Sequence, residues 1–361
     1  MKLGKIQLGM TLFACIFAVI SYATPPPDTV FKDVLDTPAR PSELAKSTLL
    51  NGITTAGMRV IAVGQKGHIL CSDDRGNNWT QAPVPVSCDL LAVHFPSEKK
   101  GWAVGHDGVV LHSEDGGATW VKQFDGRSAA QVMQRYYSNE QQCRLDQVNM
   151  AAFSEAELQQ YVDDGPDKPF LDVWFENETT GYIVGAFNLI FRTTDGGNSW
   201  TPLFDRVENP GRFHLYTIKP IGTDLFITSE QGHVFRRDDS TGQFKDIQTP
   251  YTGTFFGSTG VSGAPILFGM RGVVFRSGDG GASWGKIETG ILAALTSGTV
   301  LADGRIVLVS QMGNILVSSD NGVSFVPVMT DHSVPAAAVT TLDKDALIIA
   351  GFRGVSVVSI K

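Results

Sequence analysis

A sequence motif that recurs about every 40 residues constrains the fold of this chain more than any other feature. It places a short apolar run, a Gly-containing turn and a second apolar run in succession. Its seven copies begin at residues 63, 104, 184, 228, 268, 309 and 350. The 80-residue step between the second and third copies indicates one repeat that carries an insertion. A period of this length means that one supersecondary unit is stacked many times.

Each repeat divides into four short apolar segments. In the second copy these segments lie at 90–94, 102–104, 109–112 and 120–123, separated by turns rich in Gly and Asp. Such a pattern is typical of strands joined by hairpins, and a four-stranded unit of this period is the signature of a propeller blade. We therefore expect an all-β, seven-bladed β-propeller of four-stranded blades; a solenoid is the alternative.

The seventh repeat holds only three strands, so its fourth must come from another part of the chain. FKDVLDTP at 31–38 is similar to FKDIQTP at 244–250, the fourth strand of the fourth repeat. We expect residues 28–38 to close the ring as the outer strand of the last blade, with Phe31–Leu35 paired to the third strand, which removes a free sheet edge. The alternative is an N-terminal tail of accidental similarity.

The N-terminus has the pattern of a secretory signal peptide over residues 1–23. A basic start at Lys2 and Lys5 is followed by an apolar stretch and by small residues before the end of this segment. The apolar stretch is short for a membrane anchor, which is the first alternative; a lipoprotein-like box at Cys15 is the second. We expect residues 24–361 to be an exported, periplasmic or lumenal monomer, peripheral to a membrane at most.

Charge and metal-binding residue types exclude several function classes. The formal net charge is −8 and the chain has no basic tract, so a nucleic-acid partner is not expected. The histidines lack metal-ligand spacing, so we expect no metal and no cofactor. Three cysteines remain after residue 23, an odd number that predicts one disulfide in an exported protein. We expect a Cys88–Cys143 bond and a buried thiol at Cys71.

A second motif, Ser/Thr-x-Asp-x-Gly-x-Ser/Thr-Trp, follows the third strand in five repeats and decays to RDDSTGQF in the fourth. Its Asp can accept hydrogen bonds from turn amides, its Gly supplies a positive φ, and its aromatic residue begins the next strand. Identical groups spread one per blade do not converge on a single catalytic point. We therefore interpret these residues as structural: Asp74, Trp79, Asp115, Trp120, Asp195, Trp200, Asp279, Trp284, Asp320 and Phe325.

The copies SEDGGATW, TTDGGNSW and SGDGGASW resemble the Asp-box (bacterial neuraminidase) repeat family. VGHDGVVLHSEDGGATW and FGMRGVVFRSGDGGASW more closely resemble the photosystem II stability/assembly factor family of seven-bladed propellers. This resemblance implies a non-enzymatic scaffold that docks a protein partner and serves a membrane complex in photosynthesis. The decayed fourth motif and the 125–169 insertion depart from the family pattern. The alternative is a glycan-binding or sialidase-like glycoside hydrolase propeller, although sialidases are usually six-bladed and their Arg-Ile-Pro motif is missing here.

The alternation of strands divides the turns between two faces. One face, the Asp-box face, holds the first-to-second and third-to-fourth turns. The other face, here the link face, holds the second-to-third turns and the blade-to-blade links, and variable loops on a rigid scaffold favour it for binding. Its turns place Lys66, His106, Asp107, Arg271 and Arg353 as partner-binding candidates, and solvated turn residues are the alternative.

The insertion at 125–169 is expected to leave from the link face and to be partly helical. Residues 128–137 and 155–162 have helical composition, and Ser154 with Glu157 fits a capping box. A long excursion from one blade often binds a partner. Arg135 and Tyr136 are therefore further candidates, with packing onto the propeller as the alternative.

Overall fold

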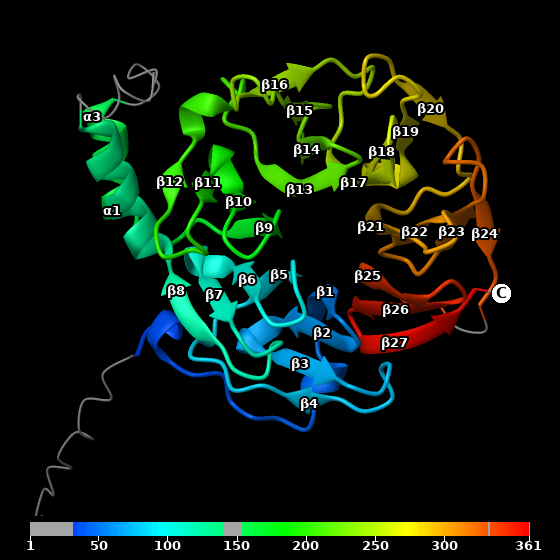
Figure 1. Ribbon diagram of the computed structural model, residues 1–361, viewed down its shortest axis with the longest axis horizontal. Helices are drawn as coiled ribbons and strands as arrows, with labels where there is room; N and C mark the ends of the chain where they lie inside the picture. The colour runs from blue at the N-terminus through cyan, green and yellow to red at the C-terminus, as the bar shows by residue number, and fades with distance from the viewer. Residues whose placement is uncertain (1–31, 140–153, 331–332, 361) are drawn as a thin grey trace, which may run out of the picture. The chain divides into compact units, whose positions relative to one another are not determined.

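Seven antiparallel sheets make up the framework of the described chain. The computed structural model describes residues 32–139, 154–330 and 333–360. Six sheets have four strands in sequence order and the last has three. In Figure 1 the sheets stand as blades around a central axis, with the first strand of each blade innermost. The predicted seven-bladed β-propeller is confirmed.

The strands follow one another from blade to blade along the chain. Blade 1 contains β1 (Leu50–Ala56), β2 (Arg59–Gly64), β3 (Ile69–Ser72) and β4 (Thr80–Gln81); blade 2 contains β5 (Leu90–His94), β6 (Gly101–Gly105), β7 (Val110–Ser113) and β8 (Val121–Phe124); blade 3 contains β9 (Phe170–Phe175), β10 (Gly181–Gly185), β11 (Ile190–Thr193) and β12 (Thr201–Pro202); blade 4 contains β13 (Leu215–Ile221), β14 (Asp224–Ser229), β15 (Val234–Arg237) and β16 (Phe244–Ile247); blade 5 contains β17 (Phe255–Val261), β18 (Ala264–Gly269), β19 (Val274–Arg276) and β20 (Gly285–Ile287); blade 6 contains β21 (Leu295–Val300), β22 (Ile306–Ser310), β23 (Ile315–Ser318) and β24 (Val326–Val328); and blade 7 contains β25 (Ala336–Asp343), β26 (Ala346–Gly351) and β27 (Gly354–Ser359).

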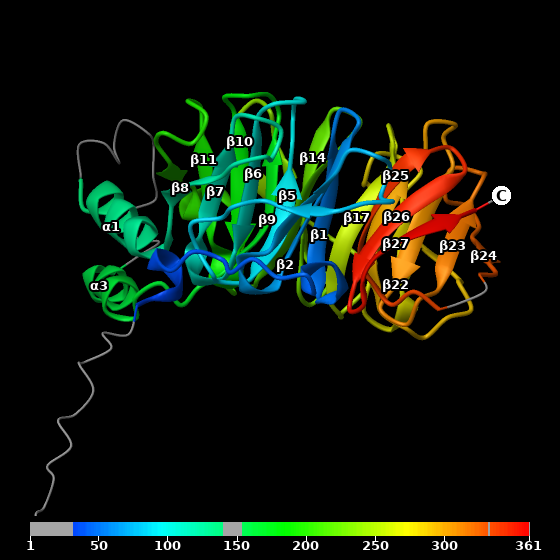
Figure 2. The ribbon, with the colours of Figure 1, turned by 90° about the horizontal axis from the view of Figure 1, so that it is seen from below.

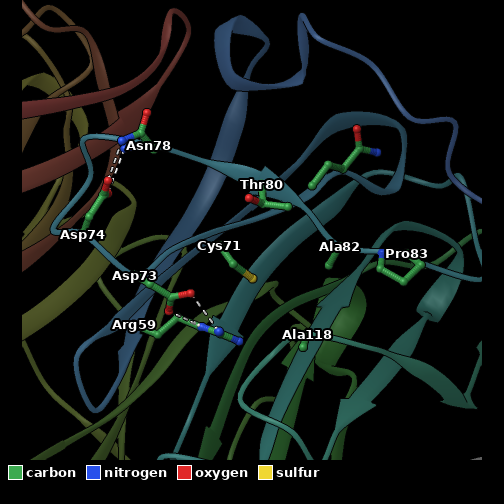
Figure 3. A pocket seen from close by; sticks show the side chains of 10 residues that line it. Arg59, Cys71, Asp73, Asp74, Asn78, Thr80, Ala82, Pro83 and Ala118 are labelled. Atoms are coloured by element: carbon green, nitrogen blue, oxygen red, sulfur yellow. Dashed lines mark hydrogen bonds and ion pairs between the residues drawn. The ribbon is translucent and has the colours of Figure 1, made fainter.

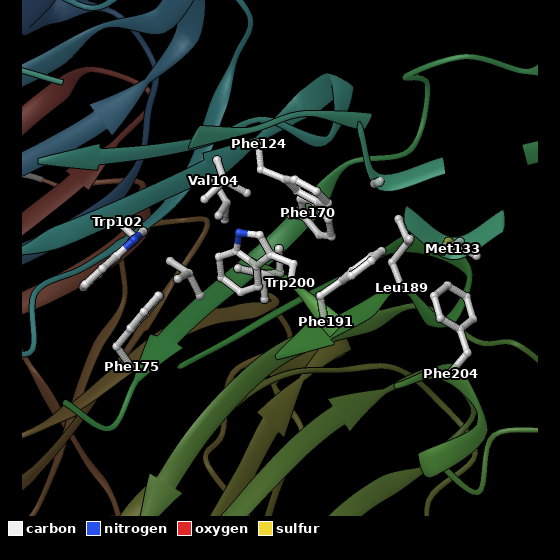
Figure 4. Close-up of a cluster of buried hydrophobic side chains, with 14 of the residues drawn as sticks. Trp102, Val104, Phe124, Met133, Phe170, Phe175, Leu189, Phe191, Trp200 and Phe204 are labelled. Carbon is white, nitrogen blue, oxygen red and sulfur yellow. The ribbon is translucent and has the colours of Figure 1, made fainter. Parts of the chain in front are cut away.

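Adjacent blades pack face to face, so the middle strands are apolar on both sides. β22, with the sequence IVLVS, is buried along its whole length, as expected for a strand that is covered on both faces. Between blades 2 and 3 the rings of Trp102 and Phe175 stack with their centroids 3.5 Å apart. Figure 4 shows Phe124 and Trp200 in the same buried cluster. The core is therefore a series of layers between blades and not a single central mass.

The described part of the predicted closing strand, residues 32–38, does not form a strand. Residues 28–31 lie outside the described part of the chain, and Val34–Asp36 form a 3₁₀ helix, η1. The side chain of Asp33 accepts a hydrogen bond from Leu35 N at 2.9 Å, and Leu35 is buried in a cluster shared by blades 1 and 2. An Asp that bonds a backbone amide two residues further on favours a turn over a strand. The sequence similarity to the outer strand of blade 4 predicted a strand, but the hydrogen bond to Asp33 stabilises a turn at this position.

Packing between the first and last blades closes the ring instead. Leu50 and Ile53 of β1 share one buried cluster with Ile348 and Ala350 of β26. At the rim, the Arg75 side chain of blade 1 forms an ion pair with Asp343 of blade 7. No strand among the described residues pairs with the outer side of β27.

Two helices lie between blades 2 and 3, inside the predicted insertion. They are α1 (Gly126–Tyr137) and α3 (Glu155–Asp163), and residues 140–153 between them are outside the described chain. Figure 1 shows both helices beyond the outer strands β8 and β12, and Figure 2 shows them at the flank of the ring. Met133 and Leu158 are buried against blade 3. The described part of the insertion therefore lies beside the ring.

Both helices are capped at their N-termini. Asp125 accepts a hydrogen bond from Ser128 N, which caps α1. The predicted capping box of Ser154 and Glu157 is present at the start of α3, with both reciprocal hydrogen bonds formed. These caps fix where each helix begins.

Each Asp-box turn is closed by hydrogen bonds to its own carboxylate. In blade 2, Asp115 Oδ1 accepts from Ser113 Oγ and Thr119 N, both at 2.9 Å, and Oδ2 accepts from Thr119 Oγ1 at 2.6 Å. Ser113 Oγ accepts from Gly117 N at 2.9 Å. Burial alone would raise the pKa of Asp115, but these hydrogen bonds outweigh it and lower that pKa. The carboxylate oxygens are thus occupied within the turn.

The other motif copies repeat this arrangement around the ring. The equivalent carboxylates, each bonded within its own turn, are Asp74, Asp195, Asp279 and Asp320. The rings that follow them differ in exposure: Trp120, Trp200 and Phe325 are buried, and Trp79 and Trp284 are half-buried. In the decayed turn of blade 4, Asp238 Oδ1 accepts from Ser240 N and Oγ, and the carboxylate also forms an ion pair with Lys245 at 2.7 Å.

Cys71 and Cys88 both carry free thiols. Cys88 is buried in the cluster shared by blades 1 and 2, and Cys71 is half-buried on β3. Burial raises the pKa of the Cys71 thiol to about 11 and that of Cys88 to about 12. Cys143 lies outside the described residues, so the Cys88–Cys143 disulfide stays a prediction.

Replacing Asp115 by Ala should destabilise the ring. The substitution removes the acceptor of three hydrogen bonds, so we expect the free energy of unfolding to fall by about 1–3 kcal/mol. Thermal and denaturant unfolding measure this loss. Glu114→Ala is the matched control, because this neighbouring carboxylate has only a 3.7 Å ion pair to Lys100. An Asp115→Ala variant that unfolds like the wild type but loses partner binding would contradict the structural role.

The two described thiols should be unreactive in the native protein. Their raised pKa values leave almost no thiolate at pH 8, and the thiolate is the reacting form. We expect slow labelling of Cys71 and Cys88 by a thiol reagent in the folded chain and complete labelling in guanidinium chloride. Non-reducing peptide mapping is the decisive measurement for Cys88. A Cys88–Cys143 linked peptide would show that the free Cys88 thiol of the structure is not the state in solution.

Candidate functional site

The second-to-third turns of blades 1, 2, 3 and 5 have a residue in the left-handed conformation at the same position. Lys66, Asp107, Phe187 and Arg271 have φ values of 57°, 57°, 53° and 58°. Non-glycine residues pay about 1–3 kcal/mol for such a conformation, which persists only where the surrounding structure imposes it. The next residue in blade 5, Gly272, allows the blade-to-blade link to approach: a Cβ there would lie 2.2 Å from Ile291 O. Turns and links therefore touch and form one continuous link face.

The predicted partner-binding residues lie on this face but do not form one cluster. Lys66, His106, Arg271 and Arg353 are exposed on blades 1, 2, 5 and 7 respectively. Asp107 is only partly exposed, because its backbone packs against Gly126 at the start of the insertion. Burial raises the pKa of the Asp107 carboxyl. Blades 5 and 7 are not neighbours, so the two arginines act as separate cationic points.

The two insertion candidates lie on the flank of blade 3. Arg135 is exposed on α1, and its Nε donates to Gln131 O of the same helix at 3.3 Å. Tyr136 is half-buried and contacts the ring of Tyr137 edge to face. Tyr137, which the sequence did not single out, is buried; its hydroxyl donates to Asp205 and accepts from Phe204 N. Tyr137 therefore fixes the insertion to the propeller, and only Arg135 is freely displayed.

The cations of the two faces differ in their partners. On the Asp-box face, Arg59 pairs with Asp73 at 2.6 Å, and Arg305 pairs with Asp303 at 2.9 Å. Within the described residues, by contrast, no ion pair involves any of the three link-face cations Lys66, Arg271 and Arg353. Unpaired cations on a rigid turn are available to a carboxylate from outside the chain.

Sequence reasoning missed the apolar character of the link face. Seven of its large apolar side chains are exposed: Leu44, Phe187, Met270, Leu292, Met312, Met329 and Phe352. Met329 and Leu292 are 91% and 88% exposed. Exposed apolar side chains gathered on one face, with polar groups among them, are characteristic of protein interaction sites. The turn sequences GMRG and GFRG already placed Met270 and Phe352 beside the predicted arginines.

A hollow on the link face surrounds Arg271. It has a volume of about 910 Å³ and is lined by the turn of blade 5 and by the two adjoining links. Tyr251 and Phe275 form apolar walls, and Met270 and Leu292 lie at its exposed edge. This combination of a cation with aromatic and apolar walls suits a peptide segment.

A second hollow lies on the rim of blade 1, away from the link face. Figure 3 shows its walls, which include Arg59, Cys71, Asp73 and Thr80, around about 420 Å³. The Arg59 guanidinium donates to both carboxylate oxygens of Asp73 and to Gly116 O, so the charge of the arginine is compensated within the chain. The raised pKa of Cys71 leaves its thiol protonated. No activated nucleophile or free charge therefore marks this hollow as a reaction site.

The central channel carries one buried ion pair. Asp172 is 4% exposed, and its carboxylate accepts from Lys219 Nζ and from Ile218 N, both at 2.9 Å. Beside them, burial lowers the pKa of His94 to about 3, so its imidazole is neutral, and its Nδ1 accepts from Phe175 N. The described lining of the channel includes no arginine. These hydrogen bonds and the ion pair join neighbouring blades.

Tyr216 also lines the channel and lies beside Glu230 of the link face. Burial and the Glu230 carboxylate raise the pKa of Tyr216. A carboxylate beside a tyrosine is also the arrangement of a base-activated nucleophile, so the lack of arginine in the described lining, and not the tyrosine, argues against a sialidase site. Among residues 32–139, 154–330 and 333–360, no His, Cys, Asp or Glu cluster could hold a metal ion, and no helix is long and apolar enough to cross a membrane.

Comparison with known proteins agrees with this geometry. The family model described as "Photosynthesis system II assembly factor YCF48" matches residues 71–152 and 150–333. The chain is 28% identical over 156 residues to the photosystem II assembly lipoprotein Ycf48 of Synechococcus sp. (strain CC9902), covering 42% of this chain and 46% of that protein. It is 30% identical over 90 residues to the chloroplastic photosystem II stability/assembly factor HCF136 of Cyanidioschyzon merolae, covering 23% of this chain and 21% of that protein. These matches span half or less of each relative's length.

Solved structures show the same fold at low sequence identity. The structure "YCF48 bound to D1 peptide" has a TM-score of 0.63 and 13% identity, covering 88% of this chain and 94% of its own. The WD40 β-propeller domain of Doa1 has a TM-score of 0.62 and 11% identity, covering 90% and 96%. The fold is therefore shared with unrelated propellers, whereas the family model matches most of the sequence. The chain belongs to the photosystem II assembly factor Ycf48 family.

Proposed function

We propose that this protein is a non-enzymatic assembly scaffold that docks a protein partner on its link face. The observation that carries the proposal is the composition of that face. Unpaired cations, among them Arg271 and Arg353, stand among exposed Met, Phe and Leu side chains, and the backbone of Arg271 is held in the left-handed conformation. Such a surface suits a peptide that has both carboxylates and apolar side chains.

The family and its relatives suggest the kind of partner. One related structure is of a YCF48 protein bound to a D1 peptide, and the curated relatives are named as photosystem II assembly factors. By extension, the partner of this chain is a segment of a photosystem II membrane protein. The scaffold acts as an exported monomer in the lumenal or periplasmic space, peripheral to the membrane. The basic start at Lys2 and Lys5 and the apolar stretch after it support export.

The glycoside hydrolase alternative has less support. A sialidase-type site needs converging arginines that bind the carboxylate of the substrate, whereas the described channel lining has no arginine. The Asp-box carboxylates are each occupied within their own turns. These observations favour docking over sugar hydrolysis.

Charge reversal at the two arginines should abolish docking. We expect the Arg271→Glu, Arg353→Glu double variant to retain its melting temperature, because both side chains are exposed and form no ion pair within the described chain. Capture of photosystem II proteins from solubilised membranes should fall at least tenfold, measured by quantitative mass spectrometry.

The matched control carries the same charge change on the Asp-box face. Lys99→Glu with Lys344→Glu alters two exposed lysines there and should capture partners as the wild type does. Equal capture by the arginine variant would contradict a role for these residues. Hydrolysis of a sialyl substrate by the wild type would favour the enzyme instead.

A further inference from the structure

Among the described residues, the outer edges of the blades are protected in six cases and open in one. Five of the outer strands contain Lys or Pro, namely Lys122 of β8, Pro202 of β12, Lys245 of β16, Lys286 of β20 and Pro327 of β24, and β4 has only two residues. Charged residues, prolines and short length are the means by which natural sheets prevent unwanted strand pairing. Blade 7 ends on β27, whose sequence GVSVVS has none of these protections.

β27 is also the longest third strand of the ring. It has six residues, whereas the third strands of the other blades have three or four. All six residues pair with β26, from Gly354 opposite Gly351 to Ser359 opposite Ala346. Val357 is 49% exposed at the middle of the strand. The outer side of β27 therefore has the length and the regular pairing that a further strand requires.

The two ends of this edge differ in charge. β27 begins on the link face, where the Gly354 backbone meets η2 (Ala45–Ser47): a Cβ on Gly354 would lie 1.8 Å from Lys46 O. Lys46 and Arg353 are both exposed there, and neither forms an ion pair within the described chain. An added antiparallel strand, like the fourth strand of the other blades, runs from the Asp-box face to the link face. Its C-terminal end therefore arrives beside these two cations.

We propose that the outer edge of β27 binds an extended segment of a partner protein as the fourth strand of blade 7. This inference rests on the proposed docking function and names the form that the docked segment takes. The segment is extended and rich in β-branched residues, because it pairs backbone to backbone beside an uncharged strand. It carries a carboxylate near its C-terminal end, where Lys46 and Arg353 lie.

Synthetic peptides test the edge without the natural partner. The probes are fluorescein-labelled TVTVTVE and its lysine counterpart TVTVTVK, with binding to the purified chain followed by fluorescence anisotropy. We expect TVTVTVE to bind at least tenfold more tightly than TVTVTVK and to slow hydrogen exchange of the amides at 354–359. Arg353→Glu should reverse this preference.

Matched substitutions assign the binding to the edge. Val357→Lys places a charge on β27 and should weaken TVTVTVE binding at least tenfold, while Val326→Lys on β24, a more exposed valine of another edge strand, should leave it unchanged. If the Val357→Lys variant binds TVTVTVE with the affinity of the wild type, the proposal is overturned.

Two further outcomes would assign the edge to another occupant and also overturn it. Amides at 354–359 that are already protected in the free protein would indicate another segment of the same chain. A dimer that Val357→Lys dissociates would indicate a second copy. Capture of photosystem II proteins equally by wild type and Val357→Lys, without peptide binding, would leave docking on the link face intact and refute only the edge.

Discussion

Face-to-face packing between neighbouring blades is the interaction on which the rest of this structure depends. Each blade is buried on both sides, so strands such as β22 are apolar throughout, and clusters such as that of Trp102 and Phe175 belong to two blades at once. No blade is stable alone, because its apolar faces are covered only by its neighbours. Unfolding one blade would therefore expose apolar surface at both of the interfaces that it forms with its neighbours.

Closure of the ring follows from the same interaction. Blades 1 and 7 meet through Leu50, Ile53 and Ile348 and through a rim ion pair, with no strand exchanged between the ends of the described chain. The N-terminal segment crosses the outside of blades 1 and 2 instead, with Leu35 buried there. Among the described residues the ring is closed by packing alone, so blade 7 has three strands and β27 is its outer edge.

The number and type of blades were predictable because the information is local: strand patterns and turn residues repeat with a fixed period. The structure of residues 32–38 was not predictable in this way. FKDVLDTP is similar in sequence to an outer strand, but the Asp33 side chain accepts a hydrogen bond from Leu35 N and so stabilises a turn. The position of Arg271 and Arg353 on the link face was predictable from the turn sequences GMRG and GFRG. The exposure of Leu292 and Met329 was not, because irregular links have no period from which burial is read. The role of Tyr137 in fixing the insertion to the propeller was also not predictable, because it depends on a hydrogen bond to Asp205 in a distant part of the sequence.

The left-handed turn position of the link face has a consequence for how such a surface changes over time. Lys66, Asp107, Phe187 and Arg271 occupy the same backbone conformation in four different blades. The strain belongs to the turn and is similar for most side chains that fill it. Exchange of one side chain for another there alters the chemistry of the surface at nearly constant stability. The ring thus carries a set of interchangeable recognition positions, and a lineage can retune its specificity blade by blade while the scaffold is inherited unchanged.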